Sequence, residues 1–363
     1  MMGYVVCEGG KQTFLFHEVE VPKAKTGALV AKVLYANICG SDMFDYVEES
    51  LEVGWGLGHE FVCEIIDIGD GVETDSNGKP VAVGDRIVCC YFVTCMKCEH
   101  CLKGDFQNCE NAYKYRPDKI AWDEWPHFVG AYGSHYYIRP DVIFYKVPDE
   151  LPSEWVAGIN CAFSQVYGGL EKQLDLREGE TFLIQGAGGL GIYAACIAAE
   201  KGAIPIVIDG VKERLDMIKR FGAAHIIDLN EYPDKKDRVK RTLELTGGKG
   251  VDKAIELCGF ADSFQEGLEH LKVTGDYCVI GISRIFRESR SVYPGLITRK
   301  ALTIKGVVRY DPAFLKKSLD FMVRFKDKYP FGELCDKPYP MKEIDSVMKR
   351  VVAKEITRAL LQP

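Results

Sequence analysis

One stretch of the sequence constrains the fold more than any other: TFLIQGAGGLGIYAACIAAEKGAIPIVIDG, at residues 181–210. It contains an apolar run, a glycine-rich turn, an alanine-rich run of helical character and a second apolar run. Apolar runs and helical patterns continue to alternate through 214–228, 250–259 and 275–282. Strands that alternate with helices in this way predict an α/β domain with a parallel, doubly wound sheet.

The glycines of this turn have the spacing G-x-G-x-x-G at Gly186, Gly188 and Gly191. In a dinucleotide-binding turn the first glycine permits the bend, the second lets a pyrophosphate approach the backbone, and the third lets helix and strand pack closely. The following helix N-terminus then offers N–H groups to the phosphates. The simpler alternative is an ordinary strand–helix turn. Because the turn joins an apolar run to an alanine-rich one, we favour the nucleotide site.

Asp209, at the end of the second apolar run, predicts the choice of cofactor. Its carboxylate would accept hydrogen bonds from the adenosine ribose and would repel the 2′-phosphate of NADP, which favours NAD. Lys212 and Arg214 follow closely and would soften that repulsion. The cofactor contacts that we predict in this region are Gly186, Gly188, Gly189, Leu190, Gly191, Asp209 and Arg214.

The first part of the chain has a different pattern. At 363 residues the chain is long enough for two domains. Up to about residue 155, short apolar runs such as 28–39, 59–69 and 84–93 are separated by glycine and proline, which predicts a β-rich domain. Beyond the alternating region, residues 313–325 have the pattern of a helix. The aromatic segment from 111 to 135 is expected to be irregular, and either helps to shape a cleft or packs against the cysteine-rich stretch at 95–109.

The charge and the cysteine content exclude several classes of function. With 46 basic and 53 acidic residues the net charge is −7, so we expect no general attraction to nucleic acid or to an anionic membrane. No apolar run is long enough for a transmembrane helix, and the first residues do not resemble a signal peptide. Fourteen cysteines without such a leader predict a reducing compartment, and we expect a cytoplasmic enzyme.

Four of the cysteines lie in CMKCEHCLKGDFQNC, at residues 95–109, with the spacing C-x2-C-x2-C-x7-C. Four thiolates so close together can bind one tetrahedral Zn²⁺, and a site with four protein ligands is structural. Free or disulfide-bonded thiols are the alternative, and a nucleic-acid-binding zinc module is another, which the acidic composition disfavours. The ligands that we predict are Cys95, Cys98, Cys101 and Cys109.

A second set of possible ligands is dispersed. Cys39 lies in ICGSD, His59 in GLGHE and Cys161 in NCAFSQVYGG. Taken singly, a cysteine or histidine in an apolar run is more often a core residue than a ligand. Taken together, two thiolates and an imidazole with an open position would make a catalytic zinc site.

These motifs together resemble the zinc-containing, medium-chain alcohol dehydrogenase family. CGSD, GHE, GDRIV, the four-cysteine stretch, CAFSQVYG and GAGGLG occur in the family's order over essentially the whole chain. The resemblance implies a GroES-like, β-rich catalytic domain over 1–155, completed by 307–363. It also implies an NAD-binding Rossmann domain over 156–306.

The resemblance assigns roles to the dispersed residues. Cys39, His59 and Cys161 match the ligands of the catalytic zinc, in the branch of the family with a cysteine as third protein ligand. Asp42 matches the carboxylate that holds the ligand histidine. Glu60 matches the acidic residue behind the metal.

Further matches concern the substrate, the proton and the cofactor. Ser41 matches the hydroxyl that passes on the alcohol proton, and Tyr91 matches a position that lines the substrate pocket. Arg358, in ITRALL, falls where family members place an arginine on the cofactor pyrophosphate. Two residues depart from the family: Gly40 replaces an arginine of some members, and Phe44 replaces the histidine that ends the proton relay. We therefore expect ordered water or a nearby polar group to complete the relay.

We thus expect a zinc-dependent, NAD-linked dehydrogenase that reversibly oxidises a primary or secondary alcohol to an aldehyde or ketone. Two zinc ions per chain, NAD and a small-molecule alcohol or carbonyl substrate are implied. The family also implies a homodimer or homotetramer. From the net negative charge and the lack of a long apolar run, we expect no nucleic-acid or membrane partner. The alternatives are an NADP-linked aldehyde or ketone reductase on the same fold, and a non-catalytic, zinc-stabilised nucleotide sensor.

Overall fold

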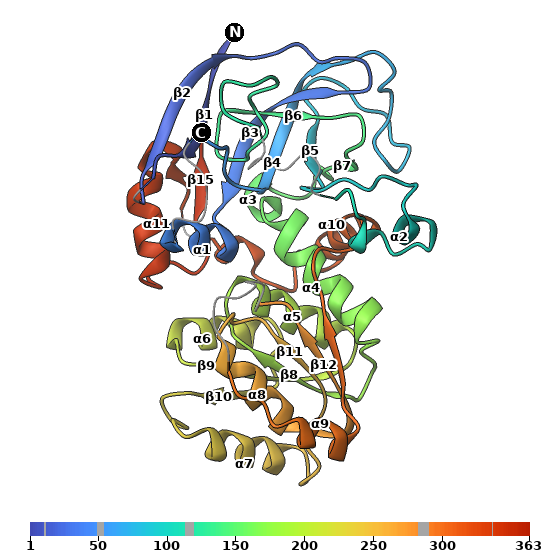
Figure 1. Ribbon diagram of the computed structural model, residues 1–363, viewed down its shortest axis with the longest axis vertical. Coiled ribbons are helices and arrows are strands. Elements are labelled where there is room, and N and C mark those ends of the chain that lie inside the picture. Colours follow the sequence, from blue (N-terminus) through green and yellow to red (C-terminus); the bar gives the residue numbers. More distant parts are fainter. Residues whose placement is uncertain (11, 49–53, 113–119, 282–289, 336) are drawn as a thin grey trace. The chain divides into compact units, whose positions relative to one another are not determined.

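The computed structural model describes residues 1–363 apart from 11, 49–53, 113–119, 282–289 and 336 (Figure 1). The described chain divides into two compact units. The first unit consists of residues 1–164 and 311–363, and the second unit of residues 165–310. Part of the aromatic segment, 113–119, lies outside the described residues.

The first unit is built on a seven-stranded sheet in which β14, β15, β3, β4, β5 and β7 are neighbours in that order and β6 pairs with β3. All pairs are antiparallel except β14–β15. The bounds are β3 (Leu29–Asn37), β4 (Glu60–Ile68), β5 (Arg86–Cys89), β6 (His135–Ile138), β7 (Phe144–Lys146), β14 (Tyr339–Pro340) and β15 (Leu360–Gln362). A separate hairpin joins β1 (Met2–Glu8) and β2 (Phe14–Glu20).

Helices of the first unit are mostly short. They are α1 (Gly40–Glu48), α2 (Glu99–Leu102), η1 (Phe106–Asn108), α3 (Ser153–Val156), η3 (Ile159–Phe163), α10 (Ala313–Phe325), η5 (Phe331–Glu333), η6 (Met341–Glu343) and α11 (Ile344–Val352). The helix predicted over 313–325 is confirmed as α10. η3 is a π-helix, and α4 (Ser164–Gly168) follows it directly.

One of the apolar core clusters of the first unit includes residues of its sheet and of α11. Ile344, Val347 and Met348 recur at helical spacing and are at most 1% exposed. They pack in the same cluster as Phe61 of β4 and Ile87 of β5. Burial of this apolar face, rather than helix propensity, therefore stabilises so short a helix.

The second unit contains a parallel six-stranded sheet in the order β10-β9-β8-β11-β12-β13. Its strands are β8 (Thr181–Gln185), β9 (Ile204–Asp209), β10 (His225–Asp228), β11 (Val251–Glu256), β12 (Leu271–Val279) and β13 (Thr303–Gly306). Its helices are η4 (Gly169–Gln173), α5 (Gly189–Glu200), α6 (Lys212–Arg220), α7 (Lys235–Leu245), α8 (Ala261–His270) and α9 (Pro294–Lys300). Strands alternate with helices, so the predicted α/β class with a doubly wound parallel sheet is confirmed (Figure 1).

Candidate metal centres and active site

The first candidate metal centre brings together four side chains that are far apart in the sequence. One ligand atom from each of Cys39, His59, Glu60 and Cys161 lies within 4.8 Å of the others. Cys39 lies two residues after the end of β3, Glu60 is the first residue of β4, and His59 directly precedes it. β3 and β4 are antiparallel neighbours with Asn37 opposite Glu60, so these ends meet at one edge of the sheet. Cys161 lies in the π-helix η3, whose five residues are all buried.

Asp42 orients the imidazole of this centre. The carboxylate lies in the first turn of α1, and its Oδ1 is 3.2 Å from His59 Nδ1. The backbone N–H of Cys39 donates to Oδ2 at 3.0 Å. Because Nδ1 faces the carboxylate, Nε2 is the ring nitrogen available to a metal, as in other carboxylate–histidine pairs.

The donor atoms of this centre shift one another's pKa values. The pKa of the Cys39 thiol is held well below its usual range, mainly by a hydrogen bond from Cys161 and then by the charge of His59. Burial alone would lower the pKa of His59, but the charges of Asp42 and Cys39 raise it well above its usual value. The Cys39 thiolate thus forms readily, whereas the hydrogen bond with Cys39 and burial raise the pKa of the Cys161 thiol well above its usual value. Two thiols and one imidazole are a donor set that fits zinc.

Glu60 is 1% exposed and is paired with Arg358. Arg358 donates to its carboxylate at 2.8 Å and is itself only 6% exposed. Burial, and then the Cys39 charge, raise the pKa of Glu60 to about 8, and Arg358 opposes this rise. The structure thus places Arg358 against Glu60 within the first unit, and its contact with a cofactor stays a prediction.

The other predicted active-site residues of the first unit surround the same centre. Ser41 lies in α1, half-buried, and contributes to the lowered pKa of Cys39. The ring of Tyr91 is tilted against His59, with centroids 5.1 Å apart. Phe44 lies one turn further along α1 than Ser41. Their roles in proton transfer and substrate contact stay predictions.

The second candidate metal centre is the four-cysteine lobe at residues 95–109. The Sγ atoms of Cys95 and Cys101 are 4.0 Å apart, as are those of Cys98 and Cys109. All four sulfurs lie within 4.8 Å of one another. A zinc tetrahedron with Zn–S bonds of about 2.3 Å has edges of about 3.8 Å. The lobe therefore fits a structural zinc ion.

The glycines of the nucleotide turn have the geometry that their predicted roles require. Gly186 has a φ of +105°, which favours glycine over other residues. A Cβ on Gly188 would meet nothing within 4 Å, so the backbone is open there. A Cβ on Gly191 would lie 1.9 Å from the carbonyl oxygen of Gly186, so any side chain would collide. Gly189 and Leu190 begin α5, whose N-terminus faces the carboxyl end of β8.

Asp209 ends β9, the neighbour of β8. Its Oδ2 accepts from Ala187 N at 2.7 Å, and its Oδ1 accepts from Gly210 N and Val211 N at 2.7 and 2.8 Å. These bonds join the glycine turn to the loop before α6. Arg214, in the first turn of α6, is half-buried. A ribose bound here would share or displace these backbone donors.

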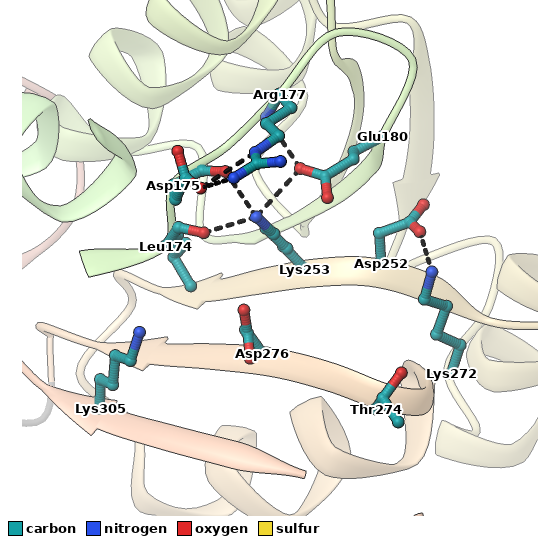
Figure 2. A pocket seen from close by; sticks show the side chains of 10 residues that line it. All are labelled: Leu174, Asp175, Arg177, Glu180, Asp252, Lys253, Lys272, Thr274, Asp276 and Lys305. Atoms are coloured by element: carbon teal, nitrogen blue, oxygen red, sulfur yellow. Dashed lines mark hydrogen bonds and ion pairs between the residues drawn. The ribbon is translucent and has the colours of Figure 1, made fainter. Parts of the chain in front are cut away.

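A cavity of about 400 Å³ lies at the opposite, amino end of the parallel strands (Figure 2). Lys253 lines it and donates to the carbonyl oxygens of Leu174 and Asp175 at 2.5 and 2.6 Å. It also lies 3.1 Å from the Glu180 carboxylate. Lys253 thus satisfies carbonyl groups that follow the π-helix η4 and ties this segment to β11.

Two residues near the first centre were not predicted from the sequence. Asn160 is fully buried and donates to the carbonyl oxygens of His59 at 2.9 Å and Cys89 at 3.0 Å, which ties η3 to β4 and β5. Its position next to Cys161 was the only available signal. Tyr132 donates to Asp42 at 2.6 Å. It belongs to the aromatic segment, for which the sequence left the role open.

Comparisons with known proteins agree with this arrangement. The alcohol dehydrogenase GroES-like domain family matches residues 25–149, and the zinc-binding dehydrogenase family matches residues 189–324. An uncharacterised zinc-type alcohol dehydrogenase-like protein from Haemophilus influenzae is 30% identical over 328 residues, covering 88% of this chain and 87% of that protein. The 5-exo-hydroxycamphor dehydrogenase of Pseudomonas putida is 26% identical and covers 95% and 94%.

Further relatives include the L-threonine 3-dehydrogenase of Pyrococcus horikoshii, 29% identical with 80% and 78% covered. Among solved structures, an alcohol dehydrogenase from Thermotoga maritima is similar over the full length of both chains, with a TM-score of 0.91 and 26% identity. In the described part of this chain, no helix has the length and apolarity needed to cross a membrane. The chain thus belongs to the zinc-binding, medium-chain alcohol dehydrogenase family, and it is a zinc-containing, NAD(P)-dependent oxidoreductase that acts on CH–OH groups.

Proposed function

We propose that the protein is a zinc-dependent, NAD-linked alcohol dehydrogenase that reversibly transfers hydride between an alcohol and the nicotinamide. The observation that carries the proposal is the convergence of Cys39, His59 and Cys161 within 4.8 Å. Two thiols and one imidazole are the protein ligands of a catalytic zinc with an open position. Asp42 behind the imidazole supports the same assignment.

Two zinc ions per chain follow from two separate ligand sets. Cys39, His59 and Cys161 would hold the catalytic ion, and the four lobe cysteines the structural one. Zinc at the first centre would supply Lewis-acid chemistry, which lowers the pKa of an oxygen ligand. Glu60 stays paired with Arg358 in this assignment.

The chain's own residues would orient the substrate and move its proton. Ser41, in α1 two residues after Cys39, would accept the alcohol proton at its hydroxyl. Phe44 cannot carry a proton, so water or a nearby polar group would complete the route to solvent. Tyr91, whose ring contacts that of His59, would form one wall of the substrate pocket.

The cofactor proposal depends on the turn at Gly186–Gly191 and on Asp209. The open backbone at Gly188 suits a pyrophosphate, and the carboxylate of Asp209 at the carboxyl end of β9 favours NAD. Lys212 and Arg214, at the start of α6, favour the second candidate, an NADP-linked aldehyde or ketone reductase.

The relatives suggest a substrate class. Threonine 3-dehydrogenase and hydroxycamphor dehydrogenase are both named for secondary alcohols. We therefore place secondary alcohols first among the primary and secondary alcohols expected. We also propose a cytoplasmic homodimer or homotetramer, following the family resemblance.

The proposal is tested by following NAD and NADP reduction with a panel of alcohols that includes amino, hydroxy-acid, polyol and bulky cyclic substrates. We expect alcohol-dependent reduction with NAD exceeding that with NADP, and greatest for a secondary alcohol. Preference for NADP with faster carbonyl reduction would favour the reductase. Binding of NAD without turnover of any alcohol would contradict the proposal in favour of a nucleotide sensor.

A further inference from the structure

Tyr132 contributes a buried phenol to the region behind the first metal centre. Its side chain is 1% exposed, and its hydroxyl donates to Asp42 Oδ2 at 2.6 Å. The other carboxylate oxygen, Oδ1, faces His59 Nδ1 at 3.2 Å. The phenol, the carboxylate and the imidazole therefore form one chain of contacts that ends at a candidate ligand.

The backbone around His59 is shaped to receive this tyrosine. Tyr132 N donates to Leu57 O at 2.9 Å, and Ala131 N donates to Gly58 O at 3.0 Å. Gly58 has a φ of +80°, and a Cβ there would lie 2.5 Å from the Tyr132 ring. The glycine of the GHE motif thus permits the ring to lie directly against the loop that carries His59.

Tyr132 supplies one of two donors to the same oxygen of Asp42. The other is the backbone N–H of Cys39, at 3.0 Å. Asp42 is only 9% exposed, so water can replace a lost donor only poorly. Without the phenol, Oδ2 would keep only one of these two donors, the Cys39 N–H, and a buried acceptor that loses a donor is destabilised in its present position. The carboxylate would then hold the contact of Oδ1 with His59 less firmly.

We propose that Tyr132 is a positioning residue, which fixes the Asp42 carboxylate and thereby holds the His59 ring in the orientation that binds the catalytic metal. The inference rests on the proposed assignment of Cys39, His59 and Cys161 as zinc ligands. A purely structural role is the competing explanation, because Tyr132 also belongs to the apolar core of the first unit. The two explanations differ in whether loss of the Tyr132 hydroxyl weakens zinc binding through Asp42 or through the packing of the core.

The test is the rate at which the purified full chain loses zinc to an excess of chelator. Tyr132→Phe keeps the ring and removes only the hydroxyl. We expect one of the two zinc ions to leave about tenfold faster, in the range found when groups that hold metal ligands are changed. The lobe ion should leave at its unmodified rate and serves as an internal reference.

Tyr46→Phe is the matched control. Tyr46 lies in the same apolar core, is 3% exposed, and its hydroxyl has no hydrogen-bond partner among the described residues. The chemical change is identical, but no bond to Asp42 is lost. Zinc release from this variant should equal that of the unmodified chain.

A double-mutant cycle with Asp42→Ala separates the two explanations. After reloading with zinc, Tyr132→Phe should cause no further acceleration in the Asp42→Ala background. Equal acceleration in both backgrounds, or none in the unmodified one, would overturn the inference while leaving the proposed function intact. If the unmodified chain binds only the lobe zinc, the proposed function fails, and the inference fails with it.

Discussion

The second unit contains a buried ion-pair network whose loss should be measurable. Arg238 of α7 forms two hydrogen bonds with Glu266 of α8, at 2.6 and 2.8 Å. The Arg238 and Glu266 side chains are 11% and 12% exposed. His270, fully buried, lies 3.4 Å from Glu266 and 2.8 Å from the Thr242 hydroxyl. The network therefore joins α7 to α8 on one side of the parallel sheet.

The pKa of Glu266 indicates how much this ion pair contributes to the folding free energy. Burial alone would raise it, but Arg238 and then His270 lower it from 4.5 to about 2. This difference corresponds to roughly 3 kcal/mol of folding free energy. Because the folded pKa is depressed, the stabilisation is fully present above about pH 4.5 and is lost as the pH falls toward 2. Removal of one partner of a buried ion pair generally costs about 3–5 kcal/mol of folding free energy, which agrees with this value.

The assay is denaturant unfolding of Glu266→Gln and of the unmodified chain, at neutral pH and near pH 3. We expect a loss of about 3 kcal/mol at neutral pH and a smaller difference near pH 3. Glu244→Gln is the matched control, because the Arg241–Glu244 pair joins residues of the same helix at 3.0 Å but is largely exposed. A loss for Glu266→Gln no larger than for this control would refute the reasoning.

Three further predictions concern the proposed sites. Cys98→Ala should lose the lobe zinc and lower the denaturant midpoint, because a structural metal contributes directly to folding; metal analysis with unfolding checks this. Ser41→Ala should lower kcat by about 10²- to 10⁴-fold, and near-normal turnover between about pH 6 and 9 would exclude the hydroxyl from the proton route. Asp209→Asn should raise kcat/KM with NADP relative to NAD. The reason is that the Asp209 carboxylate and a 2′-phosphate about 4 Å apart repel each other by roughly 4 kcal/mol at an effective dielectric of about 20. An unchanged ratio would show that Asp209 does not face the 2′-position.

Local patterns in the sequence predicted the fold class well. The turn at Gly186–Gly191 is read from six consecutive residues, and the parallel sheet follows from the strand–helix alternation around it. The lobe is similar, because its four cysteines lie within fifteen residues. Such features are formed by residues that are close together in the chain, so they can be predicted without knowledge of long-range contacts.

The first metal centre is different, because its residues are dispersed. Taken singly, Cys39, His59 and Cys161 were expected to be ordinary core residues. Their combination of ligand types suggested a zinc site, and the family resemblance then assigned them to it. The contacts that hold these ligands in place were even harder to predict from the sequence. Tyr132 lies 90 positions from Asp42, and Arg358 lies 298 positions from Glu60. No local pattern distinguishes a tyrosine that donates to a buried carboxylate from one that fills a core.

The measurement that tests the central claim most directly is zinc content, combined with alcohol-dependent NAD reduction, in Cys161→Ala and the unmodified chain. We predict two zinc ions per unmodified chain, and one in the variant, with loss of turnover but an unchanged unfolding transition. This result follows if Cys161 binds the catalytic ion and the lobe binds the other. One zinc ion in the unmodified chain, or a Cys161→Ala variant that keeps both ions and its turnover, would contradict the account.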